Sequence, residues 1–169
     1  GFADTHVGQR PNNEDWYRIA PELGLFIVAD GMGGYSGGEL ASRIAVGALD
    51  YFYRDQDFEN EEIQASSRMG HAFRLANVEV RRQRQGPFSK MGSTLSALIV
   101  RDGQALIGHV GDSRVYRVRD ERLEQLTSDH SLVAAMKTAG VSNMLIATKF
   151  GHIVTRAIEA PARYIAENA

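Results

Sequence analysis

The sequence predicts an α+β fold in which helices pack on an antiparallel sheet. Three observations support this prediction: strand-like segments come first, two long segments with helical spacing follow, and strand-like segments return from Thr94 onward. Turn residues between neighbouring strands favour antiparallel hairpins. The composition is globular, with 43% hydrophobic and 24% charged residues, and residues 1–169 are expected to form a single domain.

The first part of the chain is predicted to alternate strands and loops. Strands are expected over residues 2–5, 16–20 and 25–29, and a loop over residues 7–13. The third strand, LFIVA, is continuously apolar, which is typical of a strand covered on both faces. Residues 30–38, DGMGGYSGG, hold five glycines, which would cost too much conformational entropy in a regular element. We therefore expect a loop there.

Helical spacing dominates the middle of the chain. Helices are expected over residues 39–53 and about 61–84, each with an apolar stripe along one face. Gly86 and Pro87 are expected to end the second helix. The stripe of the first helix consists of Leu40, Ala41, Ile44, Ala45, Ala48, Leu49 and Phe52.

The last part of the chain is predicted to consist mainly of hairpins. Asp102 and Gly103 both tolerate positive φ and so favour a tight turn, and Asp120 with Glu121 separates a second pair of strands. The four strands are expected over residues 94–101, 105–110, 115–119 and 122–126. The remaining predictions are a short helix over residues 131–138 that stops at Gly140, a strand over 153–158 and a frayed tail over 163–168.

Charge and composition narrow the functional classes. The formal net charge is −2, so neither a nucleic acid nor an anionic membrane is expected as a partner. The chain has no Cys, which excludes disulfides, thiolate zinc sites and cysteine nucleophiles. No apolar run approaches the roughly 18 residues of a membrane span, and the N-terminus lacks the features of a signal peptide. The chain is therefore expected to be cytoplasmic.

Asp30 is the first candidate for chemistry. It follows an apolar strand and precedes Gly31, at which a backbone carbonyl can approach a ligand closely. The dinucleotide-binding pattern fails because Ser36 stands where a Gly is needed, and the nucleotide-binding pattern fails because Glu39 replaces its Lys. A carboxylate beside exposed carbonyls favours a hard cation with oxygen ligands. A plain turn with a capping acid is the alternative.

Glu14 and Asp15 form the second candidate, with Arg10 shortly before them. A strand, a turn and an antiparallel strand return the chain to the same end of a sheet, so Glu14 is expected near Asp30. Clustered carboxylates are tolerated where a divalent cation lies between them. Arg10 would then hold an anion through bidentate hydrogen bonds, and a surface ion pair with Glu14 is the alternative.

Two further segments place acids in turns. GDSR, residues 111–114, lies between two predicted strands, and DHS, residues 129–131, precedes a predicted helix. Each alone is more typical of a plain turn or a helix cap than of a metal site. His109 alternates with core positions and is predicted to be structural. The letters around Ser36 fit a serine hydrolase elbow, but the strand immediately before the Ser is missing.

Taken together, five segments resemble a known family. RPNNED, VADGMGG followed by GELAS, MGSTLSALIV, HVGDSRVYRVR and LTSDHS occur in this order. They are similar to the motifs of metal-dependent protein serine/threonine phosphatases of the PP2C (PPM) type, particularly the compact bacterial members. The resemblance covers residues 1–158. It implies an antiparallel β-sandwich flanked by helices, and hydrolysis of phosphoserine and phosphothreonine in phosphoprotein substrates with two Mn²⁺ or Mg²⁺ ions.

The resemblance also implies roles for single residues. Asp30 would bridge the two metals, Arg10 would bind the substrate phosphate, and Asp15 would support the ligands from behind. Two metals would activate a water and neutralise the phosphoryl oxygens, so that no protein nucleophile is needed. The implied metal residues are Glu14, Asp30, the Gly31 carbonyl and, for a third and weaker ion, Asp112.

Two departures from the family pattern affect these expectations. Met32 stands where many eukaryotic members carry a His proposed as general acid. The family's later segments supply two further Asp ligands, whereas the residues after Ile158 contain no Asp. We therefore predict a sandwich that is incomplete at the C-terminus, fewer bound ions, and reduced or absent activity. The alternative function is a pseudophosphatase that binds phosphopeptides or a partner, and a homodimer would cover the exposed sheet edges.

Overall fold

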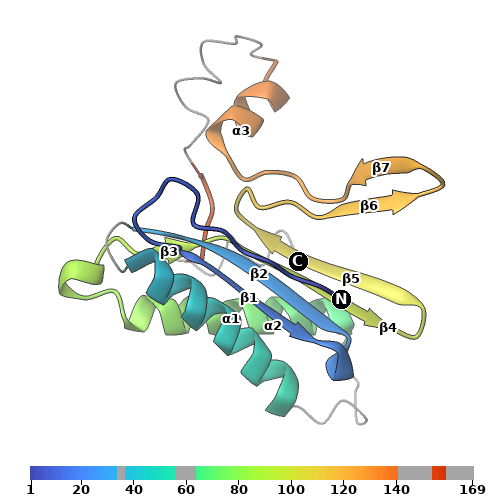
Figure 1. The fold of residues 1–169 in the computed structure, drawn as a ribbon, viewed down its shortest axis with the longest axis horizontal. Helices are drawn as coiled ribbons and strands as arrows, with labels where there is room; N and C mark the ends of the chain where they lie inside the picture. The colour runs from blue at the N-terminus through green and yellow to red at the C-terminus, as the bar shows by residue number, and fades with distance from the viewer. Residues whose placement is uncertain (34–36, 56–63, 141–153, 159–169) are drawn as a thin grey trace.

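An antiparallel sheet of five strands forms the centre of the molecule (Figure 1). The computed structural model describes residues 1–33, 37–55, 64–140 and 154–158. The strand order is β1-β2-β4-β5, and the short β3 pairs with the end of β2. The bounds are β1 Asp15–Ala20, β2 Leu25–Met32, β3 Gly92–Ser93, β4 Leu95–Arg101 and β5 Gln104–Val110. A separate hairpin consists of β6 Tyr116–Arg119 and β7 Arg122–Gln125.

Two long helices, α1 Gly37–Asp55 and α2 Ala65–Arg82, cover one face of the sheet (Figure 1). Helix α1 packs on β1 and β2, and α2 packs on α1 and β5. The short helix α3, Leu132–Thr138, lies beyond the other side of the sheet, and two 3₁₀ turns span Pro21–Leu23 and Gly86–Phe88. Within the described residues, no helix is long and apolar enough to span a bilayer.

The core lies between the sheet and the two long helices. Side chains alternate along a strand, so every second residue of β2 and β4 faces α1 and α2. Buried apolar surface stabilises by about 25 cal/mol per Å², so this layer anchors the strands that carry the site. The buried residues include Leu25, Ile27, Ala29, Leu95, Ala97 and Ile99 from the strands, and Ala45, Leu49, Ala72, Phe73 and Ala76 from the helices.

The opposite side of the sheet, which we call the open face, is only partly covered. It presents Tyr17, Phe26, Val28 and Leu98, and Val28 is 46% exposed. Phe2, near the N-terminus, lines a hollow of about 150 Å³ on this face.

Most of the predicted elements are confirmed. Strands, helices and both hairpins occur where they were expected, with ends shifted by a few residues. The turns have positive φ as predicted, at 50° for Asp102 and 74° for Gly103, and at 49° for Asp120 and 59° for Glu121. Of the expected segments, residues 34–36, 61–63, 153 and 163–168 lie outside the described part of the chain.

Three predictions are wrong. Residues 2–5 form no strand, because they lie over the open face instead of pairing with a sheet edge. Residues 30–32 are not a loop, because Gly31 and Met32 pair with β3 and so extend β2. The described residues 154–158 form only one isolated bridge, between Val154 and Ser131.

Candidate active site

Asp15 and Asp30 face each other at one end of β1 and β2. The two strands are antiparallel, with Asp15 directly opposite Asp30. Both carboxylates therefore lie on the open face, at the end of the sheet where β1 begins. Like charges directly opposite each other destabilise a pair of strands. The pair therefore marks a position where a bound cation would stabilise the sheet.

The environment of Asp30 raises its pKa to about 6. Partial desolvation is the main cause, the negative charge of Asp15 is the next, and Asp112 adds to the rise. Arg10 acts in the opposite direction through its positive charge. At neutral pH the carboxylate is ionised at an electrostatic cost, which a divalent cation would offset.

Thr94, which lies between β3 and β4, holds the backbone of Asp30. Its hydroxyl accepts a hydrogen bond from the Asp30 N–H at 2.9 Å, and its own N–H donates to the Asp30 carbonyl oxygen at 2.9 Å. Thr94 is 1% exposed, so these bonds are shielded from water. The sequence did not predict this role; the available signal was a hydroxyl residue at the start of a buried strand within one of the five segments.

Glu14 reaches the same end of the sheet through its backbone. Its carbonyl oxygen accepts hydrogen bonds from the Gly31 N–H at 3.0 Å and from Ser42 Oγ at 2.6 Å. Its carboxylate oxygen Oε1 is buried and has no hydrogen-bond partner among the described residues. A buried carboxylate oxygen without a partner is costly, and a cation is one group that would satisfy it.

Two glycines allow this close approach. A Cβ on Gly38 would lie 2.3 Å from Oε1 of Glu14, and a Cβ on Gly31 would lie 2.0 Å from the Gly38 carbonyl oxygen. The start of α1 therefore packs directly against β2 and the Glu14 side chain. Any larger residue at either position would displace the carboxylate or the backbone.

A cavity of about 210 Å³ collects the predicted residues, and Arg10, Glu14, Asp15 and Asp30 all line it. The predicted proximity of Glu14 and Asp30 is thus confirmed. The Arg10 side chain is 67% exposed, and its Nη1 lies 3.9 Å from Oε2 of Glu14. This ion pair was the alternative for Arg10, and the long distance leaves the guanidinium available to an incoming anion.

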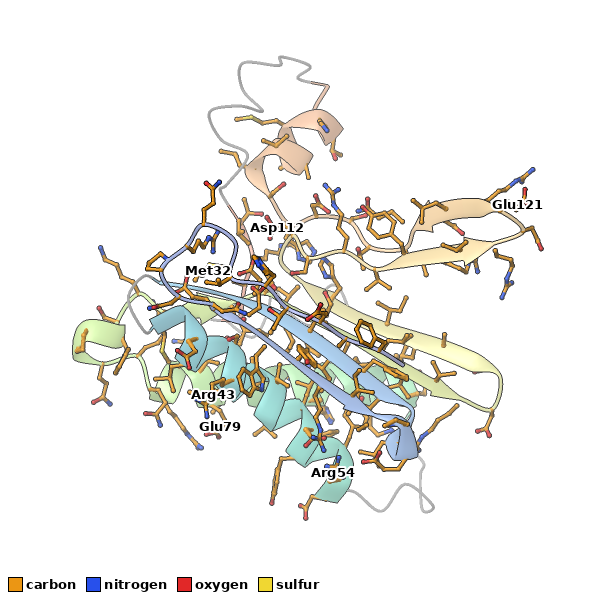
Figure 2. All side chains as sticks on the ribbon, in the orientation of Figure 1. Met32, Arg43, Arg54, Glu79, Asp112 and Glu121 are labelled. Atoms are coloured by element: carbon orange, nitrogen blue, oxygen red, sulfur yellow. The ribbon has the colours of Figure 1, made fainter. Side chains whose placement is uncertain are left out.

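Asp112 follows β5 at the same end of the molecule as Met32 (Figure 2). It lies near enough to Asp30 to raise the pKa of that carboxyl. The next residue, Ser113, places its Oγ 2.7 Å from the hydroxyl of Thr94. A second cavity, of about 280 Å³, is lined by Asp30 and Ser113 together.

The donor atoms at this edge fit a hard divalent cation. Two carboxylates, from Glu14 and Asp30, and the Gly31 carbonyl offer oxygen only, as Mg²⁺ and Mn²⁺ prefer. The unpartnered Oε1 of Glu14 is the atom that most needs such a ligand. Across the described ranges, no group of three or more His, Cys, Asp or Glu side chains is arranged to hold a metal ion. The chain therefore presents a partial donor set.

Comparisons with known proteins agree with this geometry. The family model for protein phosphatase 2C matches residues 4–160. The protein phosphatase PhpP of Streptococcus pneumoniae is 37% identical over 141 residues, which are 80% of this chain and 57% of that protein. The chain thus spans little more than half the length of this relative.

Solved structures show the same fold. The catalytic domain of the phosphatase PstP, crystallised with two manganese ions, superposes with a TM-score of 0.73 at 30% identity, over 89% of this chain and 62% of that chain. The serine/threonine phosphatase Stp1 of Staphylococcus aureus gives a TM-score of 0.81 at 28% identity, over 95% of this chain and 65% of that chain. The chain belongs to the protein phosphatase 2C family.

Proposed function

We propose that this chain hydrolyses phosphoserine and phosphothreonine in proteins with the help of Mn²⁺ or Mg²⁺. The observation that carries the proposal is the cavity that Arg10, Glu14 and Asp30 line together. It combines the electrostatically destabilised carboxylate of Asp30, the unpartnered Oε1 of Glu14 and the exposed guanidinium of Arg10. Acids that hold a cation beside an arginine that holds an anion suit the binding of a phosphate ester.

The residues divide the work by their positions. Asp30, Glu14 and the Gly31 carbonyl would hold the cations, and Arg10 would clamp the phosphoryl oxygens with its planar pair of donors. Asp15, which lies opposite Asp30 on β1, would support the metal ligands from behind. When bound, the cations would lower the pKa of water and neutralise the phosphate, so that attack on phosphorus needs no protein nucleophile. Asp112 would bind a third cation more weakly.

We further propose that the 169 residues alone turn over slowly. Only two side-chain carboxylates, those of Glu14 and Asp30, are assigned to the first two cations, and none of the residues after Asp129 is an Asp. The partial donor set favours a second candidate function, a pseudophosphatase that binds phosphopeptides through Arg10 and releases no phosphate.

Hydrolysis of p-nitrophenyl phosphate with added Mn²⁺ tests the first candidate. We expect turnover that a chelator and Asp30→Asn both abolish; turnover that survives either change would contradict the proposal. Titration with a phosphothreonine peptide tests the second candidate. Binding that Arg10→Ala weakens, with no phosphate released, would favour the pseudophosphatase.

We also propose that a second copy of the chain covers the exposed edges of the sheet. The strands β1 and β5 are the edge strands, and the open face beside them exposes the apolar side chains of Tyr17 and Val28. Light scattering at high protein concentration is expected to give the mass of a dimer. A monomeric mass under these conditions would argue against this assembly.

A further inference from the structure

His130 binds the peptide of Gly111, the residue just before Asp112, through two hydrogen bonds. The His130 N–H donates to the Gly111 carbonyl oxygen at 2.7 Å, and the Gly111 N–H donates to Nδ1 of the His130 ring at 3.1 Å. Gly111 has a φ of 111°, and a Cβ there would lie 2.6 Å from the Cβ of Thr94. The chain therefore turns tightly between the sheet on one side and His130 on the other.

The His130 ring is itself fixed in place. It stacks on the ring of His109, with 5.1 Å between the ring centroids and 24° between their planes. His109 is anchored in turn by a 3.0 Å hydrogen bond between its Nδ1 and Oγ of the buried Ser96. Burial lowers the pKa of His130 to about 4, so the ring is neutral at neutral pH and its Nδ1 accepts a hydrogen bond.

Asp129, the residue before His130, binds Arg114 at the other end of the loop 111–114. Its Oδ1 accepts from Nε of Arg114 at 2.9 Å, and its Oδ2 accepts from Nη2 at 2.6 Å. Between these two ends, Ser113 contacts the hydroxyl of Thr94. The loop 111–114 is thus held at Gly111, Ser113 and Arg114, and Asp112 lies between Gly111 and Ser113.

We propose that His130 is a positioning residue that directs the Asp112 carboxylate toward Asp30 and so sets the affinity of a divalent cation at Asp112. This inference rests on the proposed function, because it assumes that Asp112 meets a cation. Residues that orient metal ligands without touching the metal affect its affinity by roughly 10- to 100-fold. Loss of the Nδ1 acceptor would leave the Gly111 N–H without this partner, and His130 would then hold Gly111 only through the backbone hydrogen bond to its carbonyl oxygen. The turn that carries Asp112 would be held less firmly, and its carboxylate would be directed less closely toward Asp30.

Mn²⁺ titration by calorimetry, without substrate, tests the inference on the full chain. His130→Leu keeps the size of the side chain but removes the acceptor, whereas His130→Asn places an oxygen at the position of Nδ1. We expect Asp112→Asn to weaken one cation site, and His130→Leu to weaken the same site by at least about tenfold. His130→Asn is expected to restore it. His71→Leu, at an exposed histidine of α2, is the matched control and is expected to bind Mn²⁺ as the wild type does.

A double-variant cycle separates positioning from general damage. His130→Leu combined with Asp112→Asn is expected to bind Mn²⁺ no more weakly than Asp112→Asn alone, because both changes act on one site. Additive losses, or wild-type affinity in a folded His130→Leu variant, would overturn the inference. If His130→Leu does not fold, His130→Gln takes its place, since its oxygen lies one bond too far to meet the Gly111 N–H.

The proposed function fails separately from this inference. Mn²⁺ binding that Asp30→Asn leaves unchanged would defeat the proposed function, and this inference with it. Binding that Asp30→Asn and Asp112→Asn both weaken, while His130→Leu does not, would defeat only the role of His130.

Discussion

At the scale of single residues, Asp30 carries an electrostatic cost that the sheet must offset. Its pKa is raised to about 6 from an ordinary 3.8, so the folded state binds a proton more tightly than the unfolded chain does. The folded state therefore loses stability as the pH rises through this range, and the loss is complete above pH 6. The shift corresponds to about 3 kcal/mol without screening, and the solvent exposure of Asp30 reduces the expected effect to about 1 kcal/mol.

Asp30→Asn is accordingly expected to stabilise the protein when a chelator is present. At pH 7 the melting temperature should rise by about 3 °C. The gain should shrink as the pH falls from about 6 toward 3.8 and vanish below that range, where Asp30 is protonated in both states. Thermal melts at a series of pH values check this prediction, and a gain that does not depend on pH would show that the charge is not its cause.

Arg10 provides a second test at this scale. Arg10→Lys retains the positive charge but loses the planar fork, and Arg10→Ala loses both. Charge-assisted hydrogen bonds contribute roughly 1.5–3 kcal/mol, so Arg10→Ala is expected to weaken phosphopeptide binding by at least about tenfold. The lysine variant should fall between the two. Arg117→Ala, on the exposed β6 strand, is the control for a general loss of charge, and an equal effect there would remove the special role of Arg10.

The proximity of the main acids was predictable from the sequence, but the residues that support them were not. Glu14 and Asp30 were expected to meet because two antiparallel strands must return to one edge, and they line one cavity. Thr94 and His130 went unpredicted because their contacts join segments far apart in the chain. Such contacts depend on strand register and on ring orientation, which local sequence patterns do not specify.

At the scale of elements, the start of α1 is where helix and site constrain each other most. Gly38 lies in the first turn of α1, and a Cβ there would also come within 2.8 Å of the Gly31 backbone. Gly38→Ala is expected to destabilise the protein by about 1–3 kcal/mol, because the backbone of β2 must move. Mn²⁺ affinity should fall with it, since the Glu14 carboxylate is displaced.

Gly47 of the same helix provides the matched control. It is exposed, and a Cβ there would meet nothing within 4 Å. Gly47→Ala is expected to stabilise the protein by about 0.5–1 kcal/mol, because alanine loses less backbone entropy in a helix. Urea denaturation of both variants gives the comparison. A stabilising effect at both positions would mean that the start of α1 can accommodate a Cβ at Gly38.

The limits of prediction at this scale follow from particular elements. Both hairpin turns were predictable, because residues that tolerate positive φ stand at Asp102–Gly103 and Asp120–Glu121. The end of β2 was not, since glycine-rich composition favours a loop. Pairing of Gly31 and Met32 with β3 outweighs that preference.

At the scale of the whole molecule, cation binding and folding should be linked. A ligand that binds only the folded state at about 100 times its dissociation constant stabilises by about 2.7 kcal/mol. Mn²⁺ is therefore expected to raise the melting temperature by several degrees, and a chelator should reverse the rise. Asp30→Asn should remove the response. A melting temperature that Mn²⁺ leaves unchanged would contradict metal binding at this edge.

The position of Asp30 on β2 also has a consequence in time. Strand β2 pairs with β1, β3 and β4, and the amide of Asp30 is bonded to Thr94 within that network. Amides in the centre of a sheet exchange with solvent deuterium only when a large part of the structure opens. The Asp30 amide should therefore exchange about as slowly as that of the buried Ile27. Its hydrogen–deuterium exchange rate would then report how often the entire sheet opens.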